Sequence, residues 1–217
     1  MITTRYSLSG KIIIISAPSG AGKSSIIKRV VSGKHKYNIR FLVSYTTRLP
    51  RSGEVDGLDY FFVTKNIFKK MIKDKVFIEW AMVHNNYYGT SKILLDNILR
   101  AQKKVILEID VQGAMQIKKF YPDACMIFVM PPNLNNLYER LMFRQQDSCE
   151  IINERMQTAK QELKCINNYD YLVINKNNKL NDAVHAVETI IESLNYKIIN
   201  RKFCFDRFYV YNTRNNL

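Results

Sequence analysis

One continuous stretch near the amino terminus constrains the fold more than any other part of the chain. A run of β-branched residues at Lys11 to Ser16 leads into a loop that contains Gly20 and Gly22, and a Lys-Ser pair then opens a new apolar period. This order predicts a buried strand, a tight loop and a helix. The two glycines allow successive backbone N–H groups to point into one concavity at the start of the helix. The stretch therefore indicates a phosphate-binding loop.

The loop departs at one position from the general pattern G-x-x-x-x-G-K-[ST], because Ala17 stands where the pattern has glycine. We expect Lys23 to contact the β- and γ-phosphates of a nucleoside triphosphate and Ser24 to hold Mg²⁺. The predicted triphosphate site comprises nine consecutive residues: Ala17, Pro18, Ser19, Gly20, Ala21, Gly22, Lys23, Ser24 and Ser25.

The composition is that of an ordinary globular protein with a strong positive charge. The 217 residues are 47% hydrophobic and 24% charged, and 33 Lys and Arg against 19 Asp and Glu leave a net charge of +14. Nucleotides, nucleic acid or an acidic membrane surface would each suit that charge. Because no apolar run approaches the roughly 18 residues of a membrane span and residues 1–11 lack a signal-peptide core, we expect a soluble, cytoplasmic protein without a membrane partner.

The cysteines and histidines do not form a recognisable metal or disulfide pattern. The cysteines lie far apart without C-x-x-C spacing, which indicates free thiols: Cys125, Cys149, Cys165 and Cys204. The histidines have no partners at ligand spacing and are expected to be structural or exposed: His35, His84 and His185.

Strand-like and helix-like segments alternate along most of the chain. Further buried strands are expected at residues 104–109, 126–130 and 171–174. Helices are expected after Gly113, at residues 133–143, from a capping box at Asp147 and Glu150 to about 167, and at 180–194. Connections of this length indicate a parallel sheet with right-handed crossovers.

Residues 41–90 interrupt that alternation with mostly β-structure. Strands are expected at 41–45, 58–63 and 75–83, followed by a hairpin turn at 85–86, and Thr64 is expected to cap a helix over 65–73. Between the first two strands, Arg48 and Arg51 flank Pro50, whose ring stiffens the loop. Two guanidinium groups are thus held on a short segment that suits a monophosphate.

Six further motifs resemble, in order and spacing over roughly residues 10–195, those of the guanylate kinases of bacterial type. They are Ser44-Tyr-Thr-Thr-Arg-x-Pro-Arg-x-Gly-Glu54, Asp59-Tyr-Phe-Phe62, Phe77-Ile-Glu-Trp80, Asn86-Tyr-Tyr-Gly89, Leu107-Glu-Ile-Asp-Val-Gln-Gly113 and Arg140-x-x-x-Arg144. The resemblance implies an α/β P-loop nucleoside monophosphate kinase fold, with a parallel core sheet flanked by helices, a β-rich GMP-binding insertion and a helical lid.

The resemblance also implies how one domain over residues 1–217 is divided. The core comprises about 10–40, 91–143 and 168–195, the GMP-binding lobe about 41–90, and the lid about 144–167. A basic extension follows at 196–217. The implied reaction is ATP-dependent phosphorylation of GMP and dGMP to GDP and dGDP, by in-line phosphoryl transfer with Mg²⁺, in purine nucleotide metabolism and GMP recycling.

Site residues follow from the positions that match the family motifs. The GMP-binding set is Ser44, Arg48, Arg51, Glu54, Tyr60, Glu79, Tyr88, Thr90, Glu108 and Asp110. The expected catalytic set is Lys23, Arg48, Arg140, Arg144 and Arg155. Ser24 would hold Mg²⁺, with Glu108 or Asp110 acting through water, and the separate roles of these two acids stay open.

Glu79 is the residue expected to select the base. Guanine presents N1–H and the 2-amino group side by side, so one carboxylate can accept from both, and a site with such polar partners rejects analogues by roughly four orders of magnitude. Strand alternation does not reveal which way Glu79 faces. We expect its neighbour Trp80 and the phenylalanines to lie in the core.

Two other functions are compatible with this fold. One is a non-catalytic guanylate-kinase-like module that binds phosphopeptides, and the other is a related P-loop kinase with a different acceptor. Because Gly20, Gly22, Lys23 and Ser24 are all present, the sequence favours the enzyme. The basic, aromatic tail is expected to extend the last helix and pack on the body or to be partly disordered, and not to bind nucleic acid. The sequence leaves open whether the protein is a monomer or a homo-oligomer.

Overall fold

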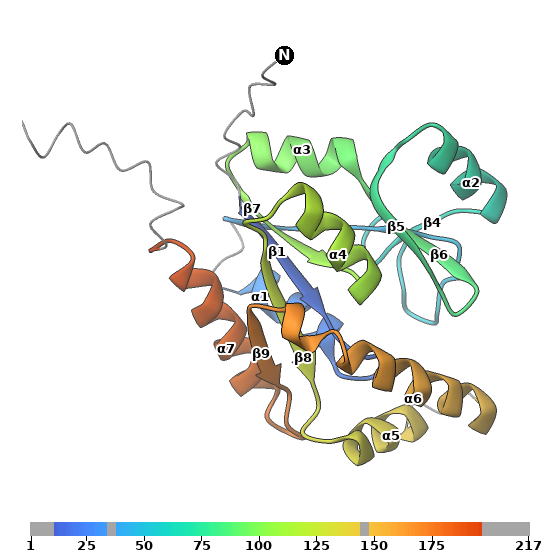
Figure 1. Ribbon diagram of the computed structural model, residues 1–217, viewed down its shortest axis with the longest axis vertical. Coiled ribbons are helices and arrows are strands. Elements are labelled where there is room, and N and C mark those ends of the chain that lie inside the picture. Colours follow the sequence, from blue (N-terminus) through green and yellow to red (C-terminus); the bar gives the residue numbers. More distant parts are fainter. Residues whose placement is uncertain (1–10, 34–37, 144–147, 197–217) are drawn as a thin grey trace, which may run out of the picture.

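A parallel sheet forms the centre of the computed structural model, which describes residues 11–33, 38–143 and 148–196. Its five strands run in the order β2-β7-β1-β8-β9, and every neighbouring pair is parallel. The strands are β1 (Lys11–Ser16), β2 (Ile39–Leu42), β7 (Lys104–Glu108), β8 (Cys125–Met130) and β9 (Tyr171–Ile174). Figure 1 shows helices on both faces, as crossovers between parallel strands require. The predicted α/β class is confirmed.

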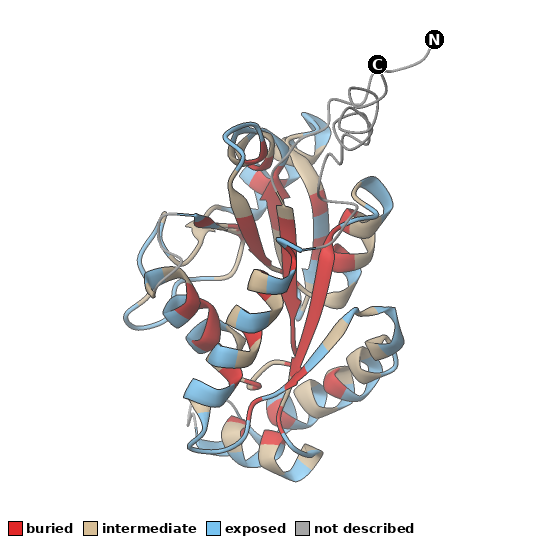
Figure 2. Ribbon diagram, turned by 90° about the vertical axis from the view of Figure 1, so that its left-hand side faces the viewer, coloured by how far each residue is buried: buried red, intermediate tan, exposed pale blue. Residues whose placement is uncertain are grey.

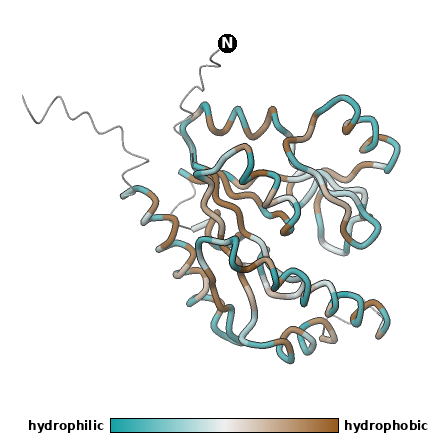
Figure 3. The backbone as a smooth tube through the Cα atoms, in the orientation of Figure 1, coloured by the Kyte–Doolittle hydropathy of each residue, from teal (hydrophilic) through white to brown (hydrophobic). Residues whose placement is uncertain are grey.

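Alternate side chains of the central strand β1 enter two different hydrophobic clusters. Ile13 and Ile15 pack with α1 (Lys23–Ser32) and α7 (Leu180–Ser193), whereas Ile12 and Ile14 pack with α3 (Lys92–Arg100) and α4 (Val111–Phe120). All four isoleucines are at most 5% exposed. A strand covered on both faces needs apolar residues at every position. The burial and hydropathy of the central strands are visible in Figures 2 and 3.

A second, smaller sheet lies beside the core, at the right of Figure 1. Its order is β4-β3-β6-β5, with β3 (Tyr45–Thr46), β4 (Phe61–Phe62), β5 (Phe77–Val83) and β6 (Asn86–Ser91). Helix α2 (Lys65–Lys73) has the bounds and the Thr64 cap that the sequence predicts. Phe68 of α2 is fully buried and stacks on Phe77 and Tyr87. An aromatic cluster therefore holds this sheet together.

The strand expected at residues 41–45 is divided between the two sheets. Phe41 and Leu42 pair with β7 in the core, whereas Tyr45 pairs with Phe61 and Gly89 in the second sheet. The chain passes from one sheet to the other at residues 43–44. The apolar run is continuous because both sheets bury part of it. The strand expected at 58–63 is also shorter than predicted, since only Phe61–Phe62 form β4.

A pair of helices, α5 (Leu134–Phe143) and α6 (Cys149–Leu163), packs at the carboxyl end of the core strands. Leu137 and Leu141 of α5 contact Ile152 and Ala159 of α6 in a small cluster of their own. The cap of α6 is Ser148, whose Oγ accepts from the Ile151 N–H; the predicted cap Asp147 lies outside the described residues. The helix also ends at Leu163, earlier than expected, and a short 3₁₀ turn follows at Ile166–Asn168.

Three cysteines fall within the described residues, and all three are free thiols, as predicted: Cys125, Cys149 and Cys165. Cys204 and His35 lie outside that part of the chain, as does the basic tail from residue 197. Among the described helices, none is both long enough and apolar enough to cross a lipid bilayer.

Candidate active site

The phosphate-binding loop follows β1 at the carboxyl edge of the sheet and leads into α1, as the sequence predicts. Gly20 and Gly22 have φ angles of +96° and +90°, in the left-handed region that side chains disfavour, and Gly22 is the N-cap of α1. The Ala21 N–H donates to the Pro18 carbonyl at 3.0 Å, which closes the turn. Ala17 is buried in the core cluster, so its methyl group is accommodated where the general pattern has glycine.

Asn175, which the sequence did not indicate, supports this loop from the end of β9. Its Nδ2 donates to the Ala21 carbonyl at 2.8 Å, and a Cβ on Gly22 would lie 2.4 Å from the same nitrogen. Gly22 is therefore required by contact as well as by backbone conformation. The only local signal was a polar residue directly after a buried strand, at the sheet edge where ligands bind in open α/β folds.

Arg140 lies beneath the phosphate loop and beside a second cavity. Its guanidinium donates to the Ala21 and Asn175 carbonyls, at 3.3 and 2.7 Å, and to Asn177 Oδ1. It lines the second cavity together with Tyr138, Asn177 and Asn178. Of the other arginines expected to close over the phosphates, Arg155 lines the cavity that contains Lys23, Ser24 and Glu79, here called the principal cavity because most of the predicted site residues line it. Arg144 lies outside the described residues.

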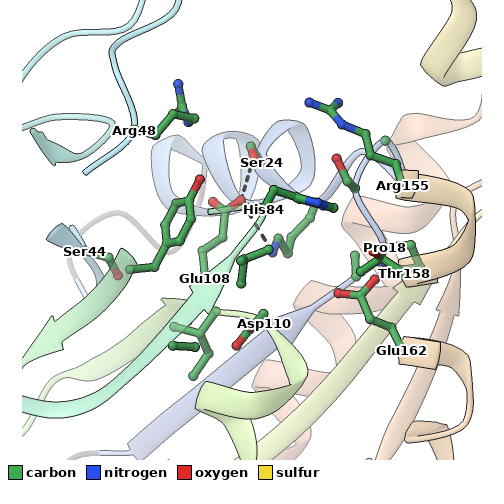
Figure 4. A pocket seen from close by; sticks show the side chains of 18 of the residues that line it. Pro18, Ser24, Ser44, Arg48, His84, Glu108, Asp110, Arg155, Thr158 and Glu162 are labelled. Atoms are coloured by element: carbon green, nitrogen blue, oxygen red, sulfur yellow. Dashed lines mark hydrogen bonds and ion pairs between the residues drawn. The ribbon is translucent and has the colours of Figure 1, made fainter. Parts of the chain in front are cut away.

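Ser24 and Glu108 meet beside the phosphate loop. Ser24 Oγ donates to Glu108 Oε1 at 2.6 Å (Figure 4). Lys23 Nζ lies 3.9 Å from the same oxygen. Hydroxyl and carboxylate oxygens are the ligands that Mg²⁺ prefers, usually one or two from protein with the rest from phosphates and water. The described residues contain no group of three or more His, Cys, Asp or Glu suited to a metal. The pair therefore fits a magnesium ion that is also bound by substrate phosphates.

Arg48 is fixed by Glu54 at the wall contributed by the second sheet. Both Glu54 oxygens accept from the guanidinium, at 2.9 and 2.8 Å, and one also accepts from the Arg51 N–H at 2.7 Å. Burial opposes ionisation of both groups, but these hydrogen bonds outweigh it, so the pKa of Glu54 is lowered and the pKa of Arg48 is raised. Glu54 thus positions the arginine loop from behind, while Arg48 and Arg51 line the cavity.

Two tyrosines complete this wall. The Tyr60 and Tyr88 rings meet edge to face at 5.9 Å, and the Arg48 guanidinium lies 5.5 Å from the Tyr60 ring centre. Both tyrosines line the principal cavity. Burial raises the pKa of Tyr60 above its usual value, so its hydroxyl remains a hydrogen-bond donor at neutral pH.

Glu79 is buried at the base of the same cavity, only 3% exposed. Thr90 Oγ1 donates to Glu79 Oε1, and Ser44 Oγ lies 3.4 Å from Thr90 Oγ1. Burial raises the pKa of Glu79 to about 7, although the Thr90 hydrogen bond acts against it, and nearby Asp110 adds to the rise. The three residues thus form one hydrogen-bonded group. The prediction that Trp80 lies in the core is wrong: it is 40% exposed, because it occupies the face of β5 opposite Glu79.

Asp110 lies near Glu79, at the N-cap of α4. Its Oδ1 accepts from the Gly113 N–H at 2.8 Å, while the residue also lines the cavity. Burial raises its pKa, against the opposing effects of the Gly113 N–H and Lys23.

Helix α6 forms the opposite wall through one face. Arg155, Thr158 and Glu162 follow at helical spacing and point into the cavity across from Arg48 (Figure 4). Burial raises the pKa of Glu162 to about 7, with Lys23 opposing and Asp110 adding to the rise. Thr158 and Glu162 were not predicted as site residues from the sequence. Their spacing from Arg155, at i+3 and i+7, places all three polar residues on one face of a helix and was the signal that could have indicated them. His84, expected to be structural or exposed, also lines this cavity.

The principal cavity therefore combines a phosphate loop, a hydroxyl–carboxylate pair suited to magnesium, an arginine wall and a buried carboxylate. Together with the parallel sheet, this set defines a P-loop α/β protein with the fold of the nucleoside monophosphate kinases.

Comparison with known proteins identifies the family. The family model described as guanylate kinase matches residues 9–194. A curated guanylate kinase from Helicobacter pylori is 43% identical over 196 residues, covering 90% of this chain and 92% of the relative, and one from Buchnera aphidicola is 44% identical over 193 residues, covering 89% and 92%. The crystal structure of guanylate kinase from Anaplasma phagocytophilum superposes with a TM-score of 0.68 at 27% identity, covering 85% of each chain. The chain belongs to the guanylate kinase family.

Proposed function

We propose that this protein transfers the γ-phosphoryl group of ATP to GMP and dGMP, forming GDP and dGDP. Membership of the guanylate kinase family supports the reaction. The observation that carries the proposal is the buried carboxylate of Glu79, which lines the same cavity as Lys23 and Ser24. One site thus combines a partner for guanine with a loop for a nucleoside triphosphate.

The acceptor base is recognised by the hydrogen-bonded group at Glu79. When ionised, this carboxylate accepts from guanine N1–H and from the 2-amino group, while Ser44 and Thr90 complete the contact. Adenine lacks that pair of donors, so its binding would leave a buried carboxylate without partners, and this is costly. Asp110 is close enough to the base end of the cavity to assist.

The acceptor phosphate is held by the arginine wall. Arg48 and Arg51 bind its oxygens, and Tyr60 and Tyr88 add hydroxyl donors. Because Glu54 already orients Arg48 through two hydrogen bonds, little side-chain freedom remains to be lost when the phosphate binds.

The donor binds on the phosphate loop, over residues 17–25. The loop N–H groups and Lys23 bind its triphosphate. The second cavity, lined by Arg140, Asn177 and Tyr138, accommodates the adenosine. Ser24 would hold Mg²⁺, with Glu108 contributing directly or through water. When bound, the metal neutralises developing charge on the phosphates and aligns donor with acceptor.

Transfer requires alignment and charge neutralisation more than covalent participation of the protein. Lys23, Arg48, Arg140, Arg144 and Arg155 supply positive charge around the reacting phosphates. Residues 41–90 act as the GMP-binding lobe, and residues 144–167 act as a lid that closes over the phosphates. Closure of the lid excludes water that would otherwise hydrolyse ATP. The protein acts in the cytoplasm, where it recycles GMP.

A coupled assay of ADP formation from ATP and Mg²⁺ tests the reaction. We expect ADP with GMP and dGMP, and none with AMP, UMP, CMP or no acceptor. Lys23→Ala should reduce GMP-dependent turnover by about three orders of magnitude while the circular dichroism spectrum stays unchanged. Acceptor-independent ADP release would instead indicate an ATPase, and near-normal turnover of Lys23→Ala would refute the role of the loop.

A further inference from the structure

Helix α4 covers the open edge of the second sheet at one residue, Trp80. Strand β5 is the edge strand, and the Trp80 backbone has Gln116 of α4 as its partner on that edge. Gln116 Nε2 donates to the Trp80 carbonyl at 2.8 Å, and Gln116 Oε1 accepts from the Trp80 N–H at 3.3 Å. The side-chain amide therefore binds the strand at both backbone groups, as a neighbouring strand would.

The strand is irregular immediately before this contact. Phe77 pairs with Ser91 and Glu79 pairs with Thr90, so one extra residue, Ile78, is inserted in β5. Such a bulge changes the direction of the side chains that follow it. Ile78 packs against the core cluster, whereas Glu79 points into the cavity. Glu79 therefore lies between the bulge at Ile78 and Trp80, the residue whose backbone Gln116 binds.

Glu79 also contacts α4 one turn before Gln116. A Cβ on Gly113 would lie 2.5 Å from Glu79 Oε2 and 3.1 Å from its carboxyl carbon. Real Cβ atoms do not approach so closely, so any larger residue at position 113 would displace the Glu79 carboxylate from this place. Thr90 binds Oε1 from the other side, and the carboxylate is held between β6 and α4.

We propose that Gly113 and Gln116 are positioning residues that set where the Glu79 carboxylate lies, and thereby contribute to guanine selection. This inference rests on the proposed function, because it assigns guanine to Glu79. Neither residue needs to contact the base: Gln116 acts through the backbone of β5, and Gly113 acts by leaving room for the Glu79 carboxylate.

The same helix connects the two ends of the cavity. Asp110, the N-cap of α4, lies two residues after Glu108, whose carboxylate accepts from Ser24 Oγ beside the phosphate loop. Helix α4 therefore fixes the position of the Glu79 carboxylate relative to Glu108, the acid at the end of β7 that is proposed to contribute to the magnesium site. A small displacement of reacting groups can reduce the rate strongly, so this connection also favours in-line alignment.

Two glutamines on α4 offer a matched test by kinetics. Gln116→Met removes both hydrogen bonds to Trp80 with little change in volume, and Gln112→Met makes the same change at an exposed position of the same helix. We expect Gln116→Met to raise the KM for GMP roughly threefold to tenfold while the KM for ATP changes less than about twofold. Gln112→Met should change neither. In a Glu79→Gln background, Gln116→Met should add no further loss; equal KM values for GMP in the two methionine variants would overturn the proposal.

A melting-temperature cycle tests the Gly113 contact without reference to activity. Gly113→Ala should lower the melting temperature of the otherwise native protein, because Cβ collides with the carboxylate. In a Glu79→Ala background it should be neutral or stabilising, since alanine favours helix over glycine. The same effect in both backgrounds would refute the contact. Failure of the native protein to phosphorylate GMP would refute the proposed function instead, and this cycle would still be interpretable.

Discussion

Glu79 illustrates a conflict between stability and function at the scale of a residue. An ionised carboxylate that is 3% exposed is poorly solvated, and hydrogen bonding by Thr90 does not offset that loss. Its pKa is therefore raised from 4.5 to about 7 by burial. In the proposed role of Glu79, guanine supplies the missing donors, so binding of GMP would relieve a cost that burial of the carboxylate imposes.

The sign of the resulting pH dependence follows from linkage. Below the unfolded pKa of 4.5, Glu79 is protonated in both states. Between pH 4.5 and about 7 the unfolded state ionises while the buried carboxyl group stays protonated, so the folded protein loses stability over this range, and the loss is complete above about pH 7. We predict that Glu79→Gln gains up to about 3 kcal/mol of unfolding free energy relative to the native protein between pH 5 and pH 8. Urea titrations at several pH values measure this, with Glu154→Gln, an exposed site, as the control. A pH-independent difference would contradict the prediction.

The phosphate loop depends on its neighbours at the scale of an element. Its two left-handed glycines have no intrinsic preference for this shape. Leu141 of α5 lies 3.0 Å from the position of a Cβ on Gly20, and Asn175 after β9 binds the Ala21 carbonyl. Residues of α5 and of the segment after β9 thus hold the loop before any phosphate arrives, and a preformed loop loses less freedom on binding.

Asn175→Asp tests this support with almost no change in shape. It places an oxygen against the Ala21 carbonyl where a donor stood, so the loop should shift. We expect the KM for ATP to rise roughly tenfold, with the KM for GMP much less affected, because a lost hydrogen bond to a buried group is costly. Steady-state kinetics measure both values, and Asn97→Asp, an exposed residue of α3, controls for the added charge. An equal rise in both KM values would argue against a local effect on the loop.

At the scale of the whole molecule, the site lies where three packed units meet. The two main clusters bury β1, β7 and β8 on both faces, and a smaller cluster joins α5 to α6. The second sheet has less buried apolar surface, with Phe68 and Ala81 as its buried hydrophobic residues. An ion pair of 2.7 Å joins Lys28 of α1 to Asp59, which lies just before β4, but the lysine is exposed and the pair stabilises little.

Local opening should follow this distribution of burial. We predict that amides of β5 and β6 exchange hydrogen faster than those of β1 and β8 in the ligand-free protein. GMP should slow exchange in β5 and β6, because it joins Glu79 to the arginine loop, and leave β1 nearly unchanged. Hydrogen exchange followed by mass spectrometry resolves these segments, and AMP is the control. Equal protection of both sheets without ligand would contradict the prediction.

The sequence by itself determined what depends on neighbouring residues in the chain. The phosphate loop follows from a strand, two glycines and a helix within about 20 residues, and α2 with its Thr64 cap follows from local period and capping. The four β-branched residues Ile12 to Ile15 predicted a strand buried on both faces. The motif spacing identified the family, which the comparisons confirm.

Only the tertiary structure decided which distant residues meet. Asn175 supports Ala21 from 154 positions away, and Gln116 binds the Trp80 backbone from 36 positions away. Period-two alternation separates Glu79 from Trp80 but assigns neither to the interior, and the bulge at Ile78 depends on pairing with β6. A segment's own sequence specifies its periodicity, whereas burial and direction are set by the surface packed against it. For that reason the loop was predictable and its supports were not.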